Sequence, residues 1–338
     1  MIVTFGEIMM RLAPTGYLRM TQTRQLEMTF GGGEANVAVS LANYGKAARF
    51  VTGLPDNDIG AACLGELRRW GVDTSAIAVR PGRMGIYFCE KGASQRPSKV
   101  IYDRADSVAA RMGAADFDWA AILDGAEWFH FTGITPALSD SMAEATLAAC
   151  QEAKRRGIPV SCDLNYRKKL WSREKAGKVM AELMPYVTLL IANEEDAADV
   201  FGIRAADTDI TGGQISLDGY RSVAEQLVER FGVQKVAITL RESVSASCNH
   251  WSALLYDGKE LFASRKYTMQ IVDRVGGGDS FGGGLIYALT EGYDSQAALE
   301  FAVAASCLKH SIEGDFNAVS AAEVLALAGG DGSGRVQR

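Results

Sequence analysis

The chain has 338 residues, of which 48% are hydrophobic and 22% charged, and its formal net charge at pH 7 is -6. This composition is typical of a folded globular protein and excludes a disordered chain, and the acidic balance argues against a nucleic-acid partner. No apolar run approaches the roughly 20 residues of a membrane span, and the N-terminus lacks the pattern of a signal peptide, so we expect a cytoplasmic protein with no membrane partner.

A short apolar run at the N-terminus, residues 1–7, predicts a buried first strand. Residues 11–30 are polar with scattered apolar side chains and no helical period, which indicates strands or loops that cover another part of the molecule. A glycine turn at residues 31–33 precedes a predicted helix at residues 37–44. By itself, such a turn is as typical of a structural connection as of a substrate site.

The next segments predict a strand at residues 48–53, a helix at 59–70 and a strand at 74–79. Between residues 80 and 110 the pattern changes to two strands joined by a polar turn. We assign this stretch, with residues 11–30, to a small β lid. Because such a sheet has an exposed apolar face that a second copy of the chain could cover, we expect a homodimer or higher homo-oligomer formed through the lid.

The second half alternates short apolar strands with amphipathic helices, the pattern of a doubly wound fold with a mostly parallel sheet. The predicted strands are residues 128–132, 160–164, 189–192 and 236–240. The predicted helices are residues 141–156, 174–184, 223–231, 281–290, 297–310 and 321–328. Residues 204–220 form a polar insertion without a period, and residues 329–338 predict a flexible tail. We therefore expect a single α/β domain over residues 1–328.

Cysteine and histidine usage gives no sign of a zinc site. The 6 cysteines lack close paired spacing, and only 3 histidines are present to help them, so we expect reduced thiols. His130 lies in an apolar run and is interpreted as a core histidine.

The strongest local signal is the segment Asp273-Arg274-Val275-Gly276-Gly277-Gly278-Asp279-Ser280-Phe281. Three consecutive glycines let backbone N–H groups converge where side chains would crowd them, and an apolar helix follows. The start of a helix binds anions through these N–H groups and the helix dipole. Asp279 stands at the end of this loop, at or next to the helix N-cap, so a carboxylate lies beside the anion pocket. This pairing suggests phosphoryl transfer to a hydroxyl.

Three other motifs could account for a glycine segment of this kind. It could be a flexible loop that ends in an ordinary N-cap aspartate. A dinucleotide fingerprint would need glycine in place of Phe281, and the lack of that fingerprint argues against a nicotinamide oxidoreductase. A P-loop would need Gly-Lys followed by Ser or Thr, and none of the Gly-Lys pairs in this chain is followed by either.

The same segment resembles the second signature of the ribokinase-like (PfkB) carbohydrate kinases, and residues 31–36 resemble their first signature, Gly-Gly-x-x-x-Asn. The resemblance implies a ribokinase-like α/β fold with a mostly parallel, doubly wound sheet flanked by helices and a small β-sheet lid. It implies ATP and Mg²⁺ as cofactors, Asp279 as the catalytic base, and the glycines Gly276, Gly277 and Gly278 as the anion hole. The family usually has Ala where this chain has Gly277.

Ligands of open parallel sheets lie beyond the C-terminal ends of the strands, which directs attention to side chains in those positions. Tyr102 and Arg104, two residues apart on a lid strand, share a face, and Tyr87 could join them from the neighbouring strand. Arg167, which follows a core strand, is a second cation. Each arginine alone could be a solvated charge or a nucleotide contact, but two together suit a carboxylate, because guanidinium pairs with it through two hydrogen bonds.

Residues 102–107, 163–167 and 239–243 resemble the 2-keto-3-deoxygluconate kinase branch of the family. That resemblance implies transfer of the ATP γ-phosphoryl group to the terminal hydroxyl of a keto-deoxy sugar acid, giving the 6-phospho product. The implied substrate-binding residues are Gly32, Gly33, Tyr87, Tyr102, Arg104, Arg167 and Asp279. The implied ATP-binding residues are Asn165, Asn193, Leu240, Arg241, Glu242, Ser243, Gly276, Gly278 and Asn317.

One position departs from the family pattern. The family has an Asn-x-x-Glu motif concerned with magnesium and phosphate, whereas this chain reads Asn193-Glu194-Glu195-Asp196. We expect Asp196 to hold magnesium through water, and the sequence leaves a monovalent cation open. Two alternatives remain: a fructokinase or another kinase for neutral sugars, and a non-catalytic sugar or nucleotide sensor, which would be expected to have lost the base or the anion hole.

Overall fold

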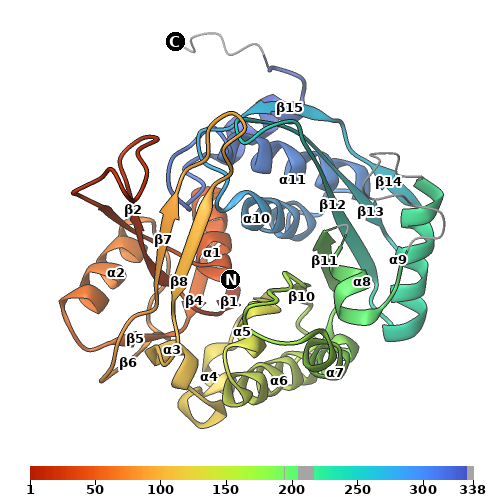
Figure 1. The fold of residues 1–338 in the computed structure, drawn as a ribbon. Coiled ribbons are helices and arrows are strands. Elements are labelled where there is room, and N and C mark those ends of the chain that lie inside the picture. The colour runs from red at the N-terminus through yellow and green to blue at the C-terminus, as the bar shows by residue number, and fades with distance from the viewer. Residues whose placement is uncertain (194, 205–216, 333–338) are drawn as a thin grey trace.

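A mixed sheet of nine strands runs through the centre of the molecule (Figure 1), in the order β14-β13-β12-β11-β10-β9-β1-β4 with β15 paired to β13. The computed structural model describes residues 1–193, 195–204 and 217–332. The strands are β1 (Ile2–Phe5), β4 (Ala48–Val51), β9 (Trp128–Thr132), β10 (Val160–Asp163), β11 (Leu189–Asn193), β12 (Lys235–Ser243), β13 (Cys248–Tyr256), β14 (Leu261–Ala263) and β15 (Tyr267–Gln270). The strands from β4 to β12 are parallel to their neighbours, and β13 pairs antiparallel with β12, β14 and β15.

The inner strands are buried because helices cover both faces of the sheet (Figure 1). Alternate side chains enter two separate cores: Val3 and Phe5 of β1 belong to one, and Ile2 belongs to the other. The first core includes side chains of α3 (Val108–Arg111), α4 (Trp119–Ile122), α6 (Asp140–Arg155), α7 (Arg173–Leu183), α8 (Asp196–Phe201) and α9 (Leu217–Phe231). The second includes side chains of α1 (Gly33–Asn43), α2 (Asp58–Arg69), α10 (Gly277–Thr290), α11 (Ser295–Lys309) and α12 (Ala321–Ala328). A short helix, α5 (Ile134–Ala137), follows β9.

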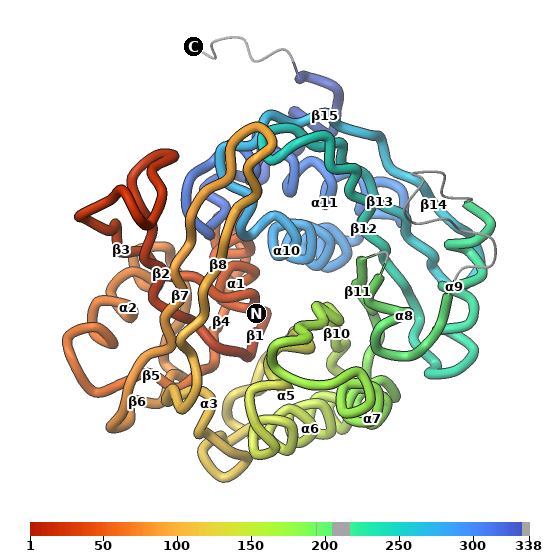
Figure 2. Tube along the Cα trace, viewed as in Figure 1, coloured from red at the N-terminus to blue at the C-terminus, as the bar shows by residue number. Residues whose placement is uncertain are grey.

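A second, separate sheet of four strands has the order β3-β2-β7-β8, with β2 (Met9–Ala13), β3 (Glu27–Gly31), β7 (Ile86–Glu90) and β8 (Lys99–Asp103). Its register places Arg11, Tyr87 and Tyr102 in one row, so their side chains share a face. The tip of the β7–β8 hairpin reaches the β12–β13 turn (Figure 2), where the Ser94 carbonyl accepts from the Ala246 N–H at 2.7 Å. A two-stranded pair, β5 (Gly53–Pro55) and β6 (Ala78–Arg80), lies apart from both sheets.

The doubly wound, mostly parallel sheet and the small second sheet confirm the expected fold class, while several element bounds differ. Helix α1 begins at Gly33 and helix α10 at Gly277, four residues before each predicted start, so both glycine turns enter their helices. The strand predicted at residues 74–79 forms only at Ala78–Arg80. Strands β13, β14 and β15 were not predicted from the sequence. Of the predicted insertion, residues 205–216 lie outside the described residues, as do residues 333–338 of the predicted tail. Among the described residues, no helix is both long and apolar enough to cross a membrane.

Candidate active site

A cavity of about 430 Å³ opens at the C-terminal ends of the parallel strands, between the large sheet and the small one. Segments from nearly the whole chain meet there, as the strand-end rule predicts. Most of the residues that the sequence analysis singled out line it: Gly32, Gly33, Tyr87, Tyr102, Arg104, Asn165, Arg167, Asn193, Asp196, Arg241, Gly276, Gly277, Gly278 and Asp279.

The glycine turn forms the floor of this cavity at the start of α10. Gly276, the N-cap, has φ +83°, and a Cβ there would lie 2.1 Å from the Asp315 carbonyl oxygen, so only glycine fits. Gly277 and Gly278 occupy the first turn, whose N–H groups have no partner within the helix. This arrangement provides an anion-binding helix start that faces the cavity.

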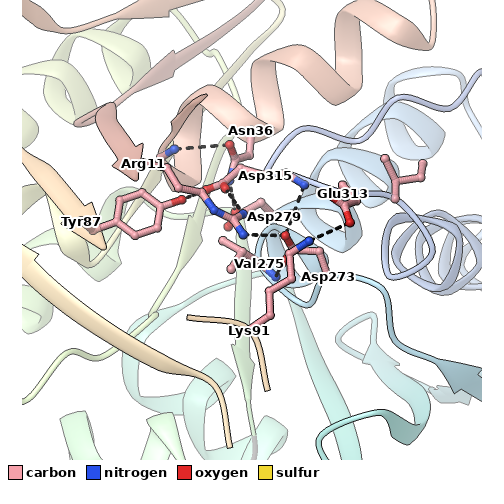
Figure 3. Close-up of polar contacts among 12 residues, drawn as sticks. Arg11, Asn36, Tyr87, Lys91, Asp273, Val275, Asp279, Glu313 and Asp315 are labelled. Atoms are coloured by element: carbon pink, nitrogen blue, oxygen red, sulfur yellow. Dashed lines mark hydrogen bonds and ion pairs between the residues drawn. The ribbon is translucent and has the colours of Figure 1, made fainter. Parts of the chain in front are cut away.

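Asp279 is the third residue of α10 and therefore lies inside the first turn, whereas it was expected at or next to the N-cap. One carboxylate oxygen, Oδ2, accepts a hydrogen bond of 2.6 Å from the Asn36 amide, as Figure 3 shows. Burial raises the pKa of the Asp279 carboxyl to about 6, although the Asn36 hydrogen bond opposes this shift. The group is thus a carboxylate near neutral pH and accepts protons better than an exposed aspartate does.

Gly277 stands where the carbohydrate kinases that the chain resembles usually have alanine, and the position of His310 explains the glycine. A Cβ on Gly277 would lie 2.3 Å from His310 Cε1. The His310 ring is 3% exposed and is fixed by a 2.7 Å hydrogen bond between Nδ1 and the Ser306 carbonyl. The histidine therefore fills the space that a methyl group would need.

We expect Gly277→Ala to lower kcat by about 10- to 100-fold, because the clash displaces the helix start by a fraction of an ångström or more. Adding His310→Ala should recover at least about tenfold of that loss by making room for the methyl group. Steady-state kinetics of both variants test this, with Gly282→Ala, whose Cβ would meet Ile191 at an ordinary 3.5 Å, as a control on the same helix. A double variant no faster than the single one would disprove the steric explanation.

Arg104 and Tyr87 line the cavity, but each already has a partner. The Arg104 guanidinium forms a buried ion pair with Glu7, which also accepts from the Ser107 hydroxyl at 2.5 Å. The Tyr87 hydroxyl donates to Asp315 Oδ2 at 2.5 Å. Tyr102 packs beside Tyr87, with ring centroids 6.1 Å apart, and the Arg104 guanidinium lies 5.6 Å from the Tyr102 ring centroid. Neither polar pair was foreseen from the sequence.

Arg167 stands in a different environment. It is exposed at the rim of the cavity, where its Nη1 lies 3.5 Å from the Tyr166 carbonyl. Among the carboxylates that the structure describes, none forms an ion pair with it. Of the two arginines expected to bind a carboxylate, Arg167 therefore keeps its guanidinium available for an added anion.

Four residues expected on the nucleotide side do not line this cavity. Strand β12 extends to Ser243, so its side chains alternate: Thr239 and Arg241 face the cavity, whereas Leu240 packs against the first core. Glu242 pairs with Lys266 at 2.5 Å, and Ser243 is exposed. Asn317 is fully buried, with its amide donating to the Tyr44 hydroxyl at 3.0 Å.

A group of carboxylates lines the cavity beside the loop that carries Arg167. Burial, followed by the charges of Asp196 and Asp279, raises the pKa of the Asp163 carboxyl well above its usual range. Asp196 begins α8, where its oxygens accept from the Asn193 N–H at 3.0 Å and the Tyr166 N–H at 3.2 Å. Glu194 lies outside the described residues. Among those described, no three His, Cys, Asp or Glu side chains form a ready metal cage. The carboxylates nevertheless suit a hydrated, oxygen-seeking cation such as Mg²⁺.

Two further residues reach the site without having been assigned a role from the sequence. Asp315 lines the cavity, and Arg11 contacts it from β2. A charged residue inside the apolar strand Met9–Ala13 was the available signal for Arg11, since a buried charge requires a partner. Asp315 follows no strand of the sheet and carried no such signal.

An open α/β sheet, an anion-binding helix start and a buried aspartate beside it define a phosphotransferase site of the ribokinase-like kind. A sequence profile described as "pfkB family carbohydrate kinase" matches residues 1–320. The chain belongs to the PfkB family of carbohydrate kinases.

Individual relatives agree with this assignment over nearly the full chain. A 2-dehydro-3-deoxygalactonokinase of Haloferax volcanii is 35% identical and covers 98% of this chain and 97% of its own. The crystal structure of a 2-dehydro-3-deoxygluconokinase from Thermotoga maritima has a TM-score of 0.93 and 50% identity, covering 97% of this chain and 98% of its own. A putative ribokinase from E. coli solved with ATP and Mg²⁺ shares the fold, with a TM-score of 0.80 and 21% identity over 96% of this chain and 97% of its own.

Proposed function

We propose that this kinase transfers the γ-phosphoryl group of ATP to the terminal hydroxyl of 2-keto-3-deoxygluconate and releases ADP and the 6-phospho product. The observation that carries the proposal is one cavity that holds an anion-binding helix start, a buried carboxylate and an available guanidinium. The T. maritima protein, a 2-dehydro-3-deoxygluconokinase by name, supports the same choice of substrate.

Asp279 acts as the general base in this proposal. Its carboxylate accepts the proton of the terminal hydroxyl while the oxygen forms its bond to phosphorus and the bond to the ADP oxygen breaks. The Asn36 amide holds one carboxylate oxygen at 2.6 Å, which leaves the other oxygen for the substrate. The N–H groups of Gly276, Gly277 and Gly278 stabilise the charge on the phosphoryl oxygens.

The nucleotide and its metal occupy the opposite side of the glycine turn in this proposal. Arg241, which faces the cavity from β12, contacts the phosphates, and Asn165 and Asn193 supply polar contacts from the ends of β10 and β11. Asp163 and Asp196 would hold Mg²⁺ through its waters, and the ion would offset phosphate charge when bound. The proposal does not require the monovalent cation that the sequence left open.

The sugar acid lies under the small sheet, with its carboxylate towards Arg167 and its carbon chain against Tyr87, Tyr102 and the Gly32-Gly33 turn. Arg104 borders the same space, where its ion pair with Glu7 makes it a hydrogen-bond donor of fixed position more than a free charge. The small sheet thus acts as a lid that excludes water from the reaction.

A panel of acceptors tests the proposed substrate. We expect kcat/KM for 2-keto-3-deoxygluconate to exceed that for fructose and ribose by at least ~100-fold, because a site with hydrogen-bonding groups for a carboxylate rejects substrates that lack one. A coupled ADP-release assay measures this, and 2-keto-3-deoxygalactonate should be included because it differs from the glucono acid only in configuration. If neutral sugars are phosphorylated equally well, the protein is a fructokinase-like enzyme and the proposed substrate is wrong. If no acceptor is phosphorylated, the protein is a non-catalytic sensor.

We also propose that a second copy of the chain covers the outer face of the small sheet. Met28, Leu12, Phe88 and Ile101 form one row on that face, and Met28 and Ile101 are 47% and 59% exposed. Sedimentation velocity should show a dimer or larger species for the native chain and a monomer for Ile101→Arg. A native monomer at micromolar concentration would reject this interface.

A further inference from the structure

Arg11 is a fully buried cation that joins the small sheet to the glycine turn, with 2% of its side chain exposed. Its Nη2 donates to Asp273 Oδ2 at 2.6 Å, and its Nη1 donates to Asp315 Oδ1 at 2.7 Å (Figure 3). The arginine comes from strand β2, whereas both carboxylates belong to segments at or beside the anion hole. One side chain thus spans the two halves of the cavity.

Asp273 links Arg11 to the backbone of the anion hole, because its carboxylate accepts hydrogen bonds from both. While Oδ2 is held by Arg11 and by the Gly314 N–H at 3.2 Å, Oδ1 accepts from the Val275 N–H at 3.2 Å. That second hydrogen bond shapes the turn that leads into Gly276, whose left-handed φ of +83° begins α10. The position of the Asp273 carboxylate therefore determines the direction in which the N–H groups of the glycine turn point.

Asp315 supports the same turn from the other side. Its backbone carbonyl packs so tightly against Gly276 that a Cβ there would lie 2.1 Å away. Its side chain is held by two residues of the small sheet, Arg11 and Tyr87. An ion pair between Lys91 and Glu313, at 2.8 Å, adds a third contact close to Asp315 in the chain. Figure 3 shows this ion pair together with the hydrogen bonds of Arg11 and Tyr87 to Asp315.

We infer that Arg11 is a positioning residue, which makes the shape of the anion hole depend on the seating of the small sheet. When the sheet is seated, one guanidinium holds both carboxylates and the turn before Gly276 is fixed. When it lifts, Asp273 and Asp315 lose the guanidinium that bridges them and the turn loses two of its supports. The kinase then presents an ordered anion hole only under a closed lid, which restricts transfer of phosphoryl groups to water.

The geometry requires a guanidinium and not merely a positive charge. Arginine presents several donors in a planar fork, so two carboxylates can be bridged in fixed directions, whereas a lysine ammonium is a single point charge on a flexible stem. Arg11→Lys therefore keeps the buried charge and removes the bridge, which makes it the informative variant. The effect on rate rests on the proposed function, but the effect on the turn does not.

Two measurements on the full-length chain test the inference. Hydrogen exchange followed by mass spectrometry should show faster exchange, by at least about tenfold, in the peptide that contains Val275 and Gly278 of Arg11→Lys. Steady-state kinetics should show kcat lowered by about 10- to 100-fold with little change in KM for ATP, because the turn is misplaced while the nucleotide contacts remain. Asp273→Asn, which keeps the size of the side chain but weakens its pairing with Arg11, should change both in the same direction.

Arg49→Lys is the matched control. Arg49 also bridges two partners, Asp73 at 2.7 Å and the Ile122 carbonyl at 2.8 Å, but it does not line the cavity. This variant should leave both the exchange of the glycine turn and kcat unchanged. Unchanged exchange in Arg11→Lys, or kcat within twofold of the native value per folded molecule, would overturn the inference. Faster exchange in a chain that phosphorylates no sugar acid would support it and reject the proposed function instead.

Discussion

Replacing Asp279 with asparagine is expected to lower kcat by at least ~100-fold, the usual scale for loss of a general base. The amide has the size of the carboxylate, and its oxygen can still accept the 2.6 Å hydrogen bond from Asn36, so the site keeps its shape. What is lost is the group that takes the proton of the acceptor hydroxyl. Nucleotide affinity should be largely unchanged, since the N–H groups of the glycine turn remain, and equilibrium binding of ATP measures this directly.

The pH dependence of the native chain gives the same group a second signature. The active form is the carboxylate, and burial raises the pKa of Asp279 to about 6, so activity is present above that pH and falls as the pH drops through it. We expect kcat/KM to decline by about tenfold per pH unit below that point in the native chain, and this limb to be absent from the residual activity of Asp279→Asn.

Asp58→Asn provides the control for this experiment. Asp58 is also an aspartate in the first turn of a helix, α2, but it is exposed and does not line the cavity. Its replacement should leave kcat unchanged. An Asp279→Asn variant with native turnover would show that the hydroxyl proton leaves by another route, and the catalytic assignment would be wrong.

Replacing Arg167 with alanine is expected to lower kcat/KM for the sugar acid by about 10- to 100-fold, mainly through KM. A hydrogen-bonded contact with a charged group contributes about 1.5–3 kcal/mol, and each 1.4 kcal/mol corresponds to about tenfold. The structure favours Arg167 over Arg104 as the main anchor, because Glu7 already neutralises Arg104. Arg104→Ala should also weaken the enzyme, partly by leaving Glu7 buried without its partner.

A comparison of kcat/KM for sugar acids and for neutral sugars shows whether Arg167 contacts a carboxylate. For the best neutral sugar of the acceptor panel, kcat/KM should stay within about twofold in Arg167→Ala, because a neutral substrate offers no carboxylate to lose. Lys168→Ala, which removes the adjacent exposed cation, is the matched control and should resemble the native chain for both substrates. Equal losses for acids and neutral sugars would contradict a carboxylate contact at Arg167.

The sequence predicted the features that depend on local pattern. Apolar runs such as Trp128–Thr132 read directly as buried strands because both of their faces are covered. The glycine segment predicted a helix start with an aspartate close to it, and the structure has a helix that begins at Gly277 with Asp279 in its first turn. The four-residue error at the start of α10 arose because glycine disfavours a helix in isolation. In the fold these glycines permit close packing: a Cβ on Gly284 would lie 3.0 Å from the Ala302 Cα of α11.

Contacts between distant segments were beyond the sequence. Arg11 pairs with carboxylates 262 and 304 residues away, and no local period reveals which acids would neutralise it. The ion pair between Glu7 and Arg104 likewise depends on how the small sheet lies on the large one. Strand β13 escaped prediction because Asn249, His250 and Ser252 interrupt its first half, so that neither a continuous apolar run nor a regular alternation marks it, and its position beyond β12 decides which side chains are buried.

The central claim is that Asp279 and the glycine turn direct the γ-phosphoryl group of ATP to one hydroxyl of a sugar acid. It is tested most directly by incubating the chain with ATP, Mg²⁺ and 2-keto-3-deoxygluconate and examining the products by phosphorus and proton NMR. The account predicts ADP and a single phosphate monoester coupled to the protons of the terminal carbon. Inorganic phosphate without an ester, or an ester at any other carbon, would contradict it.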